Sequence, residues 1–74
     1  MTVLTKADKI QLITSHKRNL EYSKYGLELD VLKENAKNSP NQEEISRLEE
    51  IIEETENQIA ALDTELATVN ALTE

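Results

Sequence analysis

The chain has 74 residues, with no cysteine, one glycine, one proline and two tyrosines as its only aromatic residues. This length allows one small domain, and the scarcity of aromatic and turn residues excludes a β-sandwich or a barrel. The net charge of −7 disfavours nucleic acid and anionic membranes as partners, and the lack of cysteine excludes disulfides, thiolate metal ligands and a cysteine nucleophile.

A first helix is predicted over about residues 6–37. Thr5, followed three residues later by Asp8, is typical of a capped helix start, and Lys33 and Lys37 suit the negatively polarised last turn. Mostly apolar residues recur at alternating spacings of three and four, as at the core positions of a heptad. This pattern predicts a buried seam of Ile10, Ile13, Lys17, Leu20, Lys24, Leu27, Val31 and Glu34.

The segment around Pro40 is the only strong break in the chain. Ser39 is the predicted N-cap of a second helix, Pro40 suits the first helical position, and Gln42 completes a capping box with Ser39. Asn38 is expected to end the first helix in the left-handed conformation, so that residues 38–40 form the turn.

The second helix is predicted over about residues 40–72. Its heptad seam runs without interruption through Ile45, Leu48, Ile52, Thr55, Ile59, Leu62, Leu66 and Val69. Folding the chain at Ser39 pairs the two seams in one register, with layers Val31–Leu48, Leu27–Ile52, Leu20–Ile59, Ile13–Leu66 and Ile10–Val69. The expected fold is therefore all-α: a single domain over 1–74 that forms a two-helix antiparallel coiled-coil hairpin.

Two seam layers are polar, because Lys17 falls opposite Leu62 and Lys24 falls opposite Thr55. We expect both ammonium groups to reach solvent while their aliphatic stems cover the seam. Charge supports the pairing of the helices, since residues 1–37 carry a net charge of +2 and residues 38–74 a net charge of −9.

A second apolar stripe lies on the first helix, roughly opposite the seam. It consists of Tyr22, Tyr25, Leu29, Leu32 and Ala36, and nothing within a hairpin would cover it. We expect a protein interface here, most simply in a homodimer that forms a four-helix bundle, although a foreign partner or simple exposure would also fit. The single mid-helix glycine, Gly26, either is tolerated on the surface or lets a second backbone approach.

Acidic residues at equivalent heptad positions of both helices are expected to form a ridge along one edge of the hairpin. The ridge consists of Glu21, Glu28, Glu49, Glu56 and Asp63. It would place like charges opposite each other, as a solubilising face, a docking strip for a basic partner or a weak divalent-cation site. His16 is the only histidine, and we assign no catalytic, cofactor-binding or metal-binding residue because no further ligand or base accompanies it.

The sequence thus predicts a non-enzymatic structural, assembly or adaptor protein that acts through protein–protein contacts. The alternative is a small acidic regulator or inhibitor, phage-encoded or cellular, that docks on a basic surface of a larger protein. The chain has no apolar run of membrane-spanning length and no signal-peptide pattern. We expect it in the cytoplasm, or in the virion or host cytoplasm if it is phage-encoded.

Overall fold

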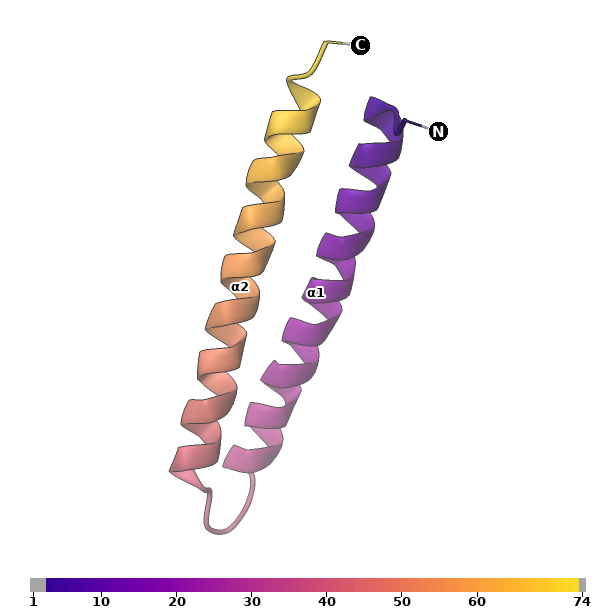
Figure 1. Cartoon of the computed structure of the whole chain (residues 1–74). Coiled ribbons are helices and arrows are strands. Elements are labelled where there is room, and N and C mark those ends of the chain that lie inside the picture. The colour runs from indigo at the N-terminus through magenta and orange to yellow at the C-terminus, as the bar shows by residue number, and fades with distance from the viewer. Residues whose placement is uncertain (1–2, 74) are drawn as a thin grey trace.

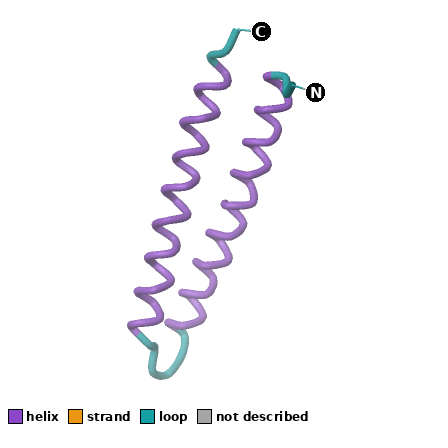
Figure 2. Tube along the Cα trace, in the orientation of Figure 1, coloured by secondary structure: helices purple, strands orange, loops and turns teal. Residues whose placement is uncertain are grey.

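The computed structural model describes residues 3–73 as two long antiparallel helices joined by one loop (Figures 1 and 2). Helix α1 spans Lys6–Asn35 and helix α2 spans Gln42–Asn70. The molecule is a rod of about 57 × 18 × 16 Å, with both chain ends at the end opposite the loop. There the Lys6 ammonium donates a hydrogen bond to the carbonyl oxygen of Leu72 at 3.1 Å. The predicted all-α helical hairpin is confirmed.

The buried side of each helix follows the predicted seam. Ile45, Leu48 and Val69 retain 5–7% of their accessible surface, and every other predicted seam position on both helices is buried or half-buried. Apolar residues at spacings of three and four place one face of each helix against the other, and this burial holds the helices together.

The polar seam residues satisfy their hydrogen-bonding groups locally. Thr55 retains 7% of its surface and donates its hydroxyl hydrogen to the carbonyl oxygen of Ile51 at 2.8 Å. Lys17 and Lys24 are half-buried, and their ammonium groups leave the seam to pair with carboxylates of α2. Such groups are tolerated between helices because none is buried without a partner.

The start of α1 agrees with the prediction. The Thr5 hydroxyl accepts a hydrogen bond from the backbone N–H of Asp8 at 3.1 Å, and the Asp8 carboxylate accepts one from the backbone N–H of Thr5 at 3.2 Å. This reciprocal capping box satisfies two donors that the first helical turn leaves free.

The start of α2 differs from the prediction, in which Ser39 was the N-cap and Pro40 the first helical residue. The N-cap is Asn41, whose side-chain oxygen accepts from the backbone N–H groups of Glu43 and Glu44 at 3.0 and 3.2 Å. Pro40 remains in the loop, and Gln42 is the first helical residue instead of a capping-box partner. Asparagine caps as well as serine, and at position 41 it gains a further hydrogen bond from its own backbone N–H to Glu34.

The end of α1 is also earlier than predicted. The helix stops at Asn35, with Ala36 as its C-cap in the right-handed region, and the backbone N–H of Lys37 donates to the carbonyl oxygen of Glu34 at 3.2 Å. Asn38 does not take the left-handed conformation, because no residue of the described chain has a positive φ. A loop of six residues, 36–41, therefore replaces the predicted turn over 38–40. Helix α2 likewise ends at Asn70, before the predicted residue 72.

Candidate protein-interaction surface

The second apolar stripe of α1 lies open to solvent. Tyr22, Tyr25 and Leu32 keep 66%, 62% and 64% of their accessible surface, Leu29 keeps 40%, and Ala36 is exposed as well. These side chains recur every three or four residues, so they line one face of α1 over about four turns. The structure therefore places all five predicted interface residues on one exposed apolar surface, which we call the stripe.

Arg18 continues the stripe toward the open end of the hairpin. Its guanidinium carbon lies 4.9 Å from the centre of the Tyr22 ring, and its Nη2 lies 3.4 Å from the Tyr22 hydroxyl oxygen. This cation–π contact holds the tyrosine ring against the helix surface. A ring that is already ordered loses less conformational freedom when a partner covers it.

The acidic ridge is partly neutralised by the two seam lysines, which was not expected from the sequence. The Lys17 ammonium lies 2.7 Å from Asp63 Oδ1, and the Lys24 ammonium lies 3.2 Å from Glu56 Oε2. The hydrogen bond to Asp63 and its negative charge raise the pKa of Lys17 above its ordinary value. We had expected the ridge carboxylates of the two helices to face each other. Glu56 and Asp63 instead each pair with a lysine from the opposite helix.

The other three ridge residues, Glu21, Glu28 and Glu49, have no such lysine among residues 3–73. Glu28 of α1 and Glu49 of α2 line one open groove of about 300 Å³, and within residues 3–73 no cation lies within ion-pair distance of either carboxylate. Val31 and Ile52 of the seam and Tyr25 and Leu32 of the stripe provide the rest of its lining. This arrangement joins an apolar surface to a pair of carboxylates that lack a cation.

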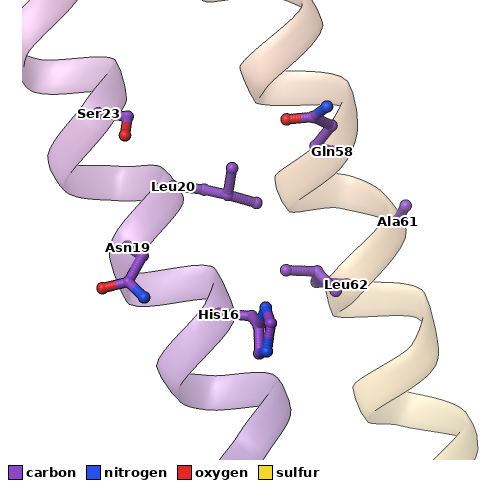
Figure 3. Close-up of a pocket in the computed structure, with 7 residues that line it drawn as sticks. All are labelled: His16, Asn19, Leu20, Ser23, Gln58, Ala61 and Leu62. Carbon is purple, nitrogen blue, oxygen red and sulfur yellow. The ribbon is translucent and has the colours of Figure 1, made fainter.

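A larger groove lies on the opposite flank, halfway along the rod (Figure 3). Leu20 and His16 extend from α1 toward α2, and Leu62 extends from α2 toward α1. The groove has a volume of about 450 Å³, and its lining is completed by Asn19, Ser23, Gln58 and Ala61. Ser23 and Ala61 are too small to fill the space beside the seam, which explains the hollow. The sequence pattern did not predict this groove, and His16 forms no ion pair within residues 3–73.

A polar cluster at the loop end ties the helices together. Glu34 retains 8% of its surface, and its carboxylate accepts from the backbone N–H of Asn41 at 3.0 Å and from the Lys37 ammonium at 2.9 Å. The hydrogen bond from Asn41, followed by that from Lys37, lowers the pKa of Glu34 below its ordinary value. Nearby, Arg47 donates through Nε to Glu44 Oε2 at 3.0 Å and through Nη2 to Oε1, which lowers the pKa of Glu44 and raises that of Arg47. These groups fix the loop, and Glu34, Lys37, Glu44 and Arg47 line an open groove of about 380 Å³ there.

Metal-ligand clusters and membrane-spanning helices were also sought among the described residues. No group of three or more acidic or histidine side chains between residues 3 and 73 could hold a metal ion. Neither α1 nor α2 contains an apolar segment long enough to cross a membrane. Comparisons with known protein families, with curated proteins and with solved structures found no match.

Proposed function

We propose that this chain is a non-enzymatic assembly or adaptor protein, a coiled-coil hairpin that pairs with a second copy through the stripe. The exposure of the stripe is the observation that carries the proposal, since Tyr22, Tyr25 and Leu32 each keep more than 60% of their surface on one face of α1. Large apolar side chains grouped in this way are unusual on a soluble monomer and mark interaction surfaces. Tyrosine supports the assignment further, because its large rigid ring is enriched in protein interfaces.

Charge supports pairing through α1 and opposes pairing through α2. Residues 38–74 carry ten acidic side chains and a single basic one, Arg47. Arg47 already pairs with Glu44, so two α2 helices would bring unneutralised carboxylates together. A dimer of four helices that meets through α1 avoids this repulsion.

The open shape of the hairpin supports a non-enzymatic role. Its grooves run along the flanks of a two-helix rod only 16–18 Å thick. Catalysis generally uses a concave pocket that excludes water and holds groups in fixed positions. We propose the cytoplasm as the location, because a chain without cysteine suits a reducing compartment.

Size-exclusion chromatography with light scattering tests the self-association. We expect a dimer that dissociates when both Tyr25 and Leu32 are changed to serine. The matched control is Leu12→Ser, since Leu12 is also on α1 and 48% exposed but lies outside the stripe. A monomer at all accessible concentrations, or a dimer that both variants weaken equally, would contradict the proposal.

A second candidate function is favoured by the outward side of α2. Glu43, Glu50, Glu53 and Glu54 are exposed there, and none has an ion pair among residues 3–73. This face could dock on a basic surface of a larger protein, so that the chain acts as a small acidic regulator or inhibitor. Binding to a synthetic lysine-rich helical peptide tests this role: we expect capture that falls steeply with salt and is weakened by Glu50→Gln combined with Glu53→Gln. Binding that does not respond to salt would contradict it.

A further inference from the structure

We propose that two copies of the chain pair in parallel, with their loops at the same end, and that the second copy's Lys33 pairs with Glu28 at the edge of the acidic groove. The inference rests on the self-association proposed above and adds its orientation and its electrostatic partner. It follows from three features of α1: the stripe, the carboxylates on one side of the stripe and the lysine on the other.

The first feature is the position of the carboxylates without a cation. Along the ridge, Lys17 and Lys24 neutralise Asp63 and Glu56, whereas Glu28 and Glu49 share a groove with no cation within ion-pair distance in the described chain. That groove is also lined by Tyr25 and Leu32 of the stripe. Whatever covers the stripe therefore lies directly beside two unneutralised carboxylates, and a positively charged group is favoured there.

The second feature is a cation on the other side of the stripe. At 100° per residue, Glu28 lies beside the stripe on the flank nearest α2's acidic edge, and Lys33 lies beside it on the opposite flank. The Lys33 side chain is 76% exposed, and its one carboxylate partner among residues 3–73 is Asp30 on its own helix, at 3.3 Å. An exposed pair within one helix contributes little, so the ammonium is available to a nearer or better-placed carboxylate.

Parallel pairing brings these two flanks together. When two parallel helices meet through a heptad stripe, the residue before the first stripe position of each heptad (here Tyr22, Leu29 and Ala36) faces the residue five places further on in the other helix. Here that rule pairs Glu28 with the second copy's Lys33, twice by symmetry. The stripe residues Tyr22, Tyr25, Leu29, Leu32 and Ala36 then each meet their own counterparts, so that all five layers are used.

Antiparallel pairing through the same stripe places no cation opposite the Glu28 carboxylate. The alignment that stacks Tyr25 on Leu29 of the second copy places Glu28 opposite its own counterpart. The alignment displaced by one heptad, which stacks Leu29 on Leu32, places Glu28 opposite Asn35. The first leaves like charges facing each other, which is destabilising, and the second leaves the carboxylates unneutralised.

The parallel arrangement also keeps the acidic helices apart. The stripe lies roughly opposite the seam on α1, so the four helices form a row with the two α1 helices at the centre and α2 on each outer side. Arg18, which lies against the Tyr22 ring, marks the end of the contact toward the chain termini. The outward face of α2 stays available to other partners.

A cysteine placed at Ala36 distinguishes the orientations, because the chain has no cysteine of its own. Ala36 is exposed at the end of the stripe and meets its counterpart only in the parallel dimer. In either antiparallel alignment the two positions are at least about 16 Å apart along the helix axis, at ~1.5 Å per residue. Under mild oxidation we expect a disulfide-linked dimer from Ala36→Cys and only background cross-linking from Glu50→Cys, a matched exposed position on α2.

Charge exchange tests the ion pair. We expect Glu28→Lys and Lys33→Glu each to weaken dimerisation several-fold, and the double exchange to restore it, while Lys9→Glu, the same charge change away from the stripe, has little effect. Light scattering at about 200 µM is appropriate, because the stripe has five residues and a standard interface has about 20–30 residues a side. A wild-type chain that stays monomeric there contradicts the self-association itself. A dimer in which Ala36→Cys cross-links no better than Glu50→Cys, or in which the double exchange restores nothing, overturns only the parallel orientation.

Discussion

The carboxylate of Glu34, one residue before the end of α1, accepts a hydrogen bond at 3.0 Å from the backbone N–H of Asn41, the residue that caps α2. The end of one helix therefore fixes the start of the next across the loop. Glu34 occupies a seam position and is 92% buried, yet its carboxylate also accepts from Lys37, so the charge is compensated. The contact makes the loop part of the folded unit and not merely a tether.

This contact gives the hairpin a distinct pH dependence. The folded chain lowers the pKa of Glu34 below its ordinary value of 4.5, so the stabilisation is fully present above that value and is lost as the pH falls through the folded-state pKa. We expect Glu34→Gln to lower the thermal midpoint at neutral pH, and the difference from wild type to shrink as the pH falls below 4.5 and then through the lower folded-state pKa of Glu34. Glu50→Gln, an exposed change on α2, is the control. A Glu34→Gln deficit that persists unchanged in acid would contradict the role of the charge.

The cap of α2 can be tested by two alanine substitutions. Asn41→Ala removes the acceptor for the backbone N–H groups of Glu43 and Glu44, and we expect it to lower the free energy of unfolding by about 1 kcal/mol. Ser39→Ala should change it by less than about 0.5 kcal/mol, since Ser39 is exposed in the loop. Urea denaturation measures both. A larger loss of unfolding free energy for Ser39→Ala than for Asn41→Ala would show that Ser39 is the N-cap, as expected from the sequence.

The loss of a leucine from the seam should lower the stability of the monomer, whereas the loss of one from the stripe should weaken self-association. Leu48 keeps 5% of its surface, and Leu48→Ala should cost about 2–5 kcal/mol of unfolding free energy. Leu32 keeps 64%, and Leu32→Ala should change the stability of the monomer by no more than about 0.5 kcal/mol while it weakens self-association. Denaturation below the dimer's dissociation constant, paired with light scattering above it, separates the two effects. Equal losses of stability would show that the stripe is part of the monomer's core.

Gly26 offers a stabilising substitution. Apart from its chain neighbours and the adjacent backbone of α1, no atom of the described chain would lie within 4 Å of a Cβ at Gly26. A glycine inside a helix costs up to about 1 kcal/mol relative to alanine. We therefore expect Gly26→Ala to raise the midpoint of thermal unfolding, as followed by circular dichroism. Gly26 lies beside the stripe on the same flank as Lys33, where a methyl group at the edge of the contact should leave dimerisation unchanged. Weaker dimerisation on this change would instead favour a close approach of a second backbone at Gly26.

The pairing of the seam lysines with the ridge predicts energetic coupling between the helices. In a double-mutant cycle, Lys17→Met and Asp63→Asn should show coupling at low ionic strength, since the two charged groups are 2.7 Å apart. The coupling should largely disappear at about 1 M salt, because both side chains are partly exposed. The same cycle with Glu53→Gln in place of Asp63→Asn serves as the control and should show none. Coupling that resists salt would mean that the pair is less accessible to solvent than the structure indicates.

Much of the architecture was determined by the sequence itself. Apolar residues at spacings of three and four define one buried face on each helix, and a single break near Pro40 makes the helices neighbours, so the hairpin and all its seam positions were predictable. The Thr5 cap was predictable from the sequence because a capping box involves only residues within one helical turn. The exposed stripe was predictable for the same reason, since helical periodicity alone separates it from the seam.

Other features could not be predicted from the sequence. Some depend on contacts between residues that lie far apart in it, and in others two residues suit the same role equally well. Ser39 and Asn41 are both good caps. Asn41 is distinguished only in the folded loop, where its backbone N–H donates to the Glu34 carboxylate. Likewise, heptad positions place five carboxylates on one ridge, but only the packed helices show that Lys17 and Lys24 reach two of them. Local periodicity determines which face of a helix is buried and which seam layers are expected to pair. The partner of a long charged side chain depends instead on the path that its stem takes out of the seam, and only the packed helices fix that path.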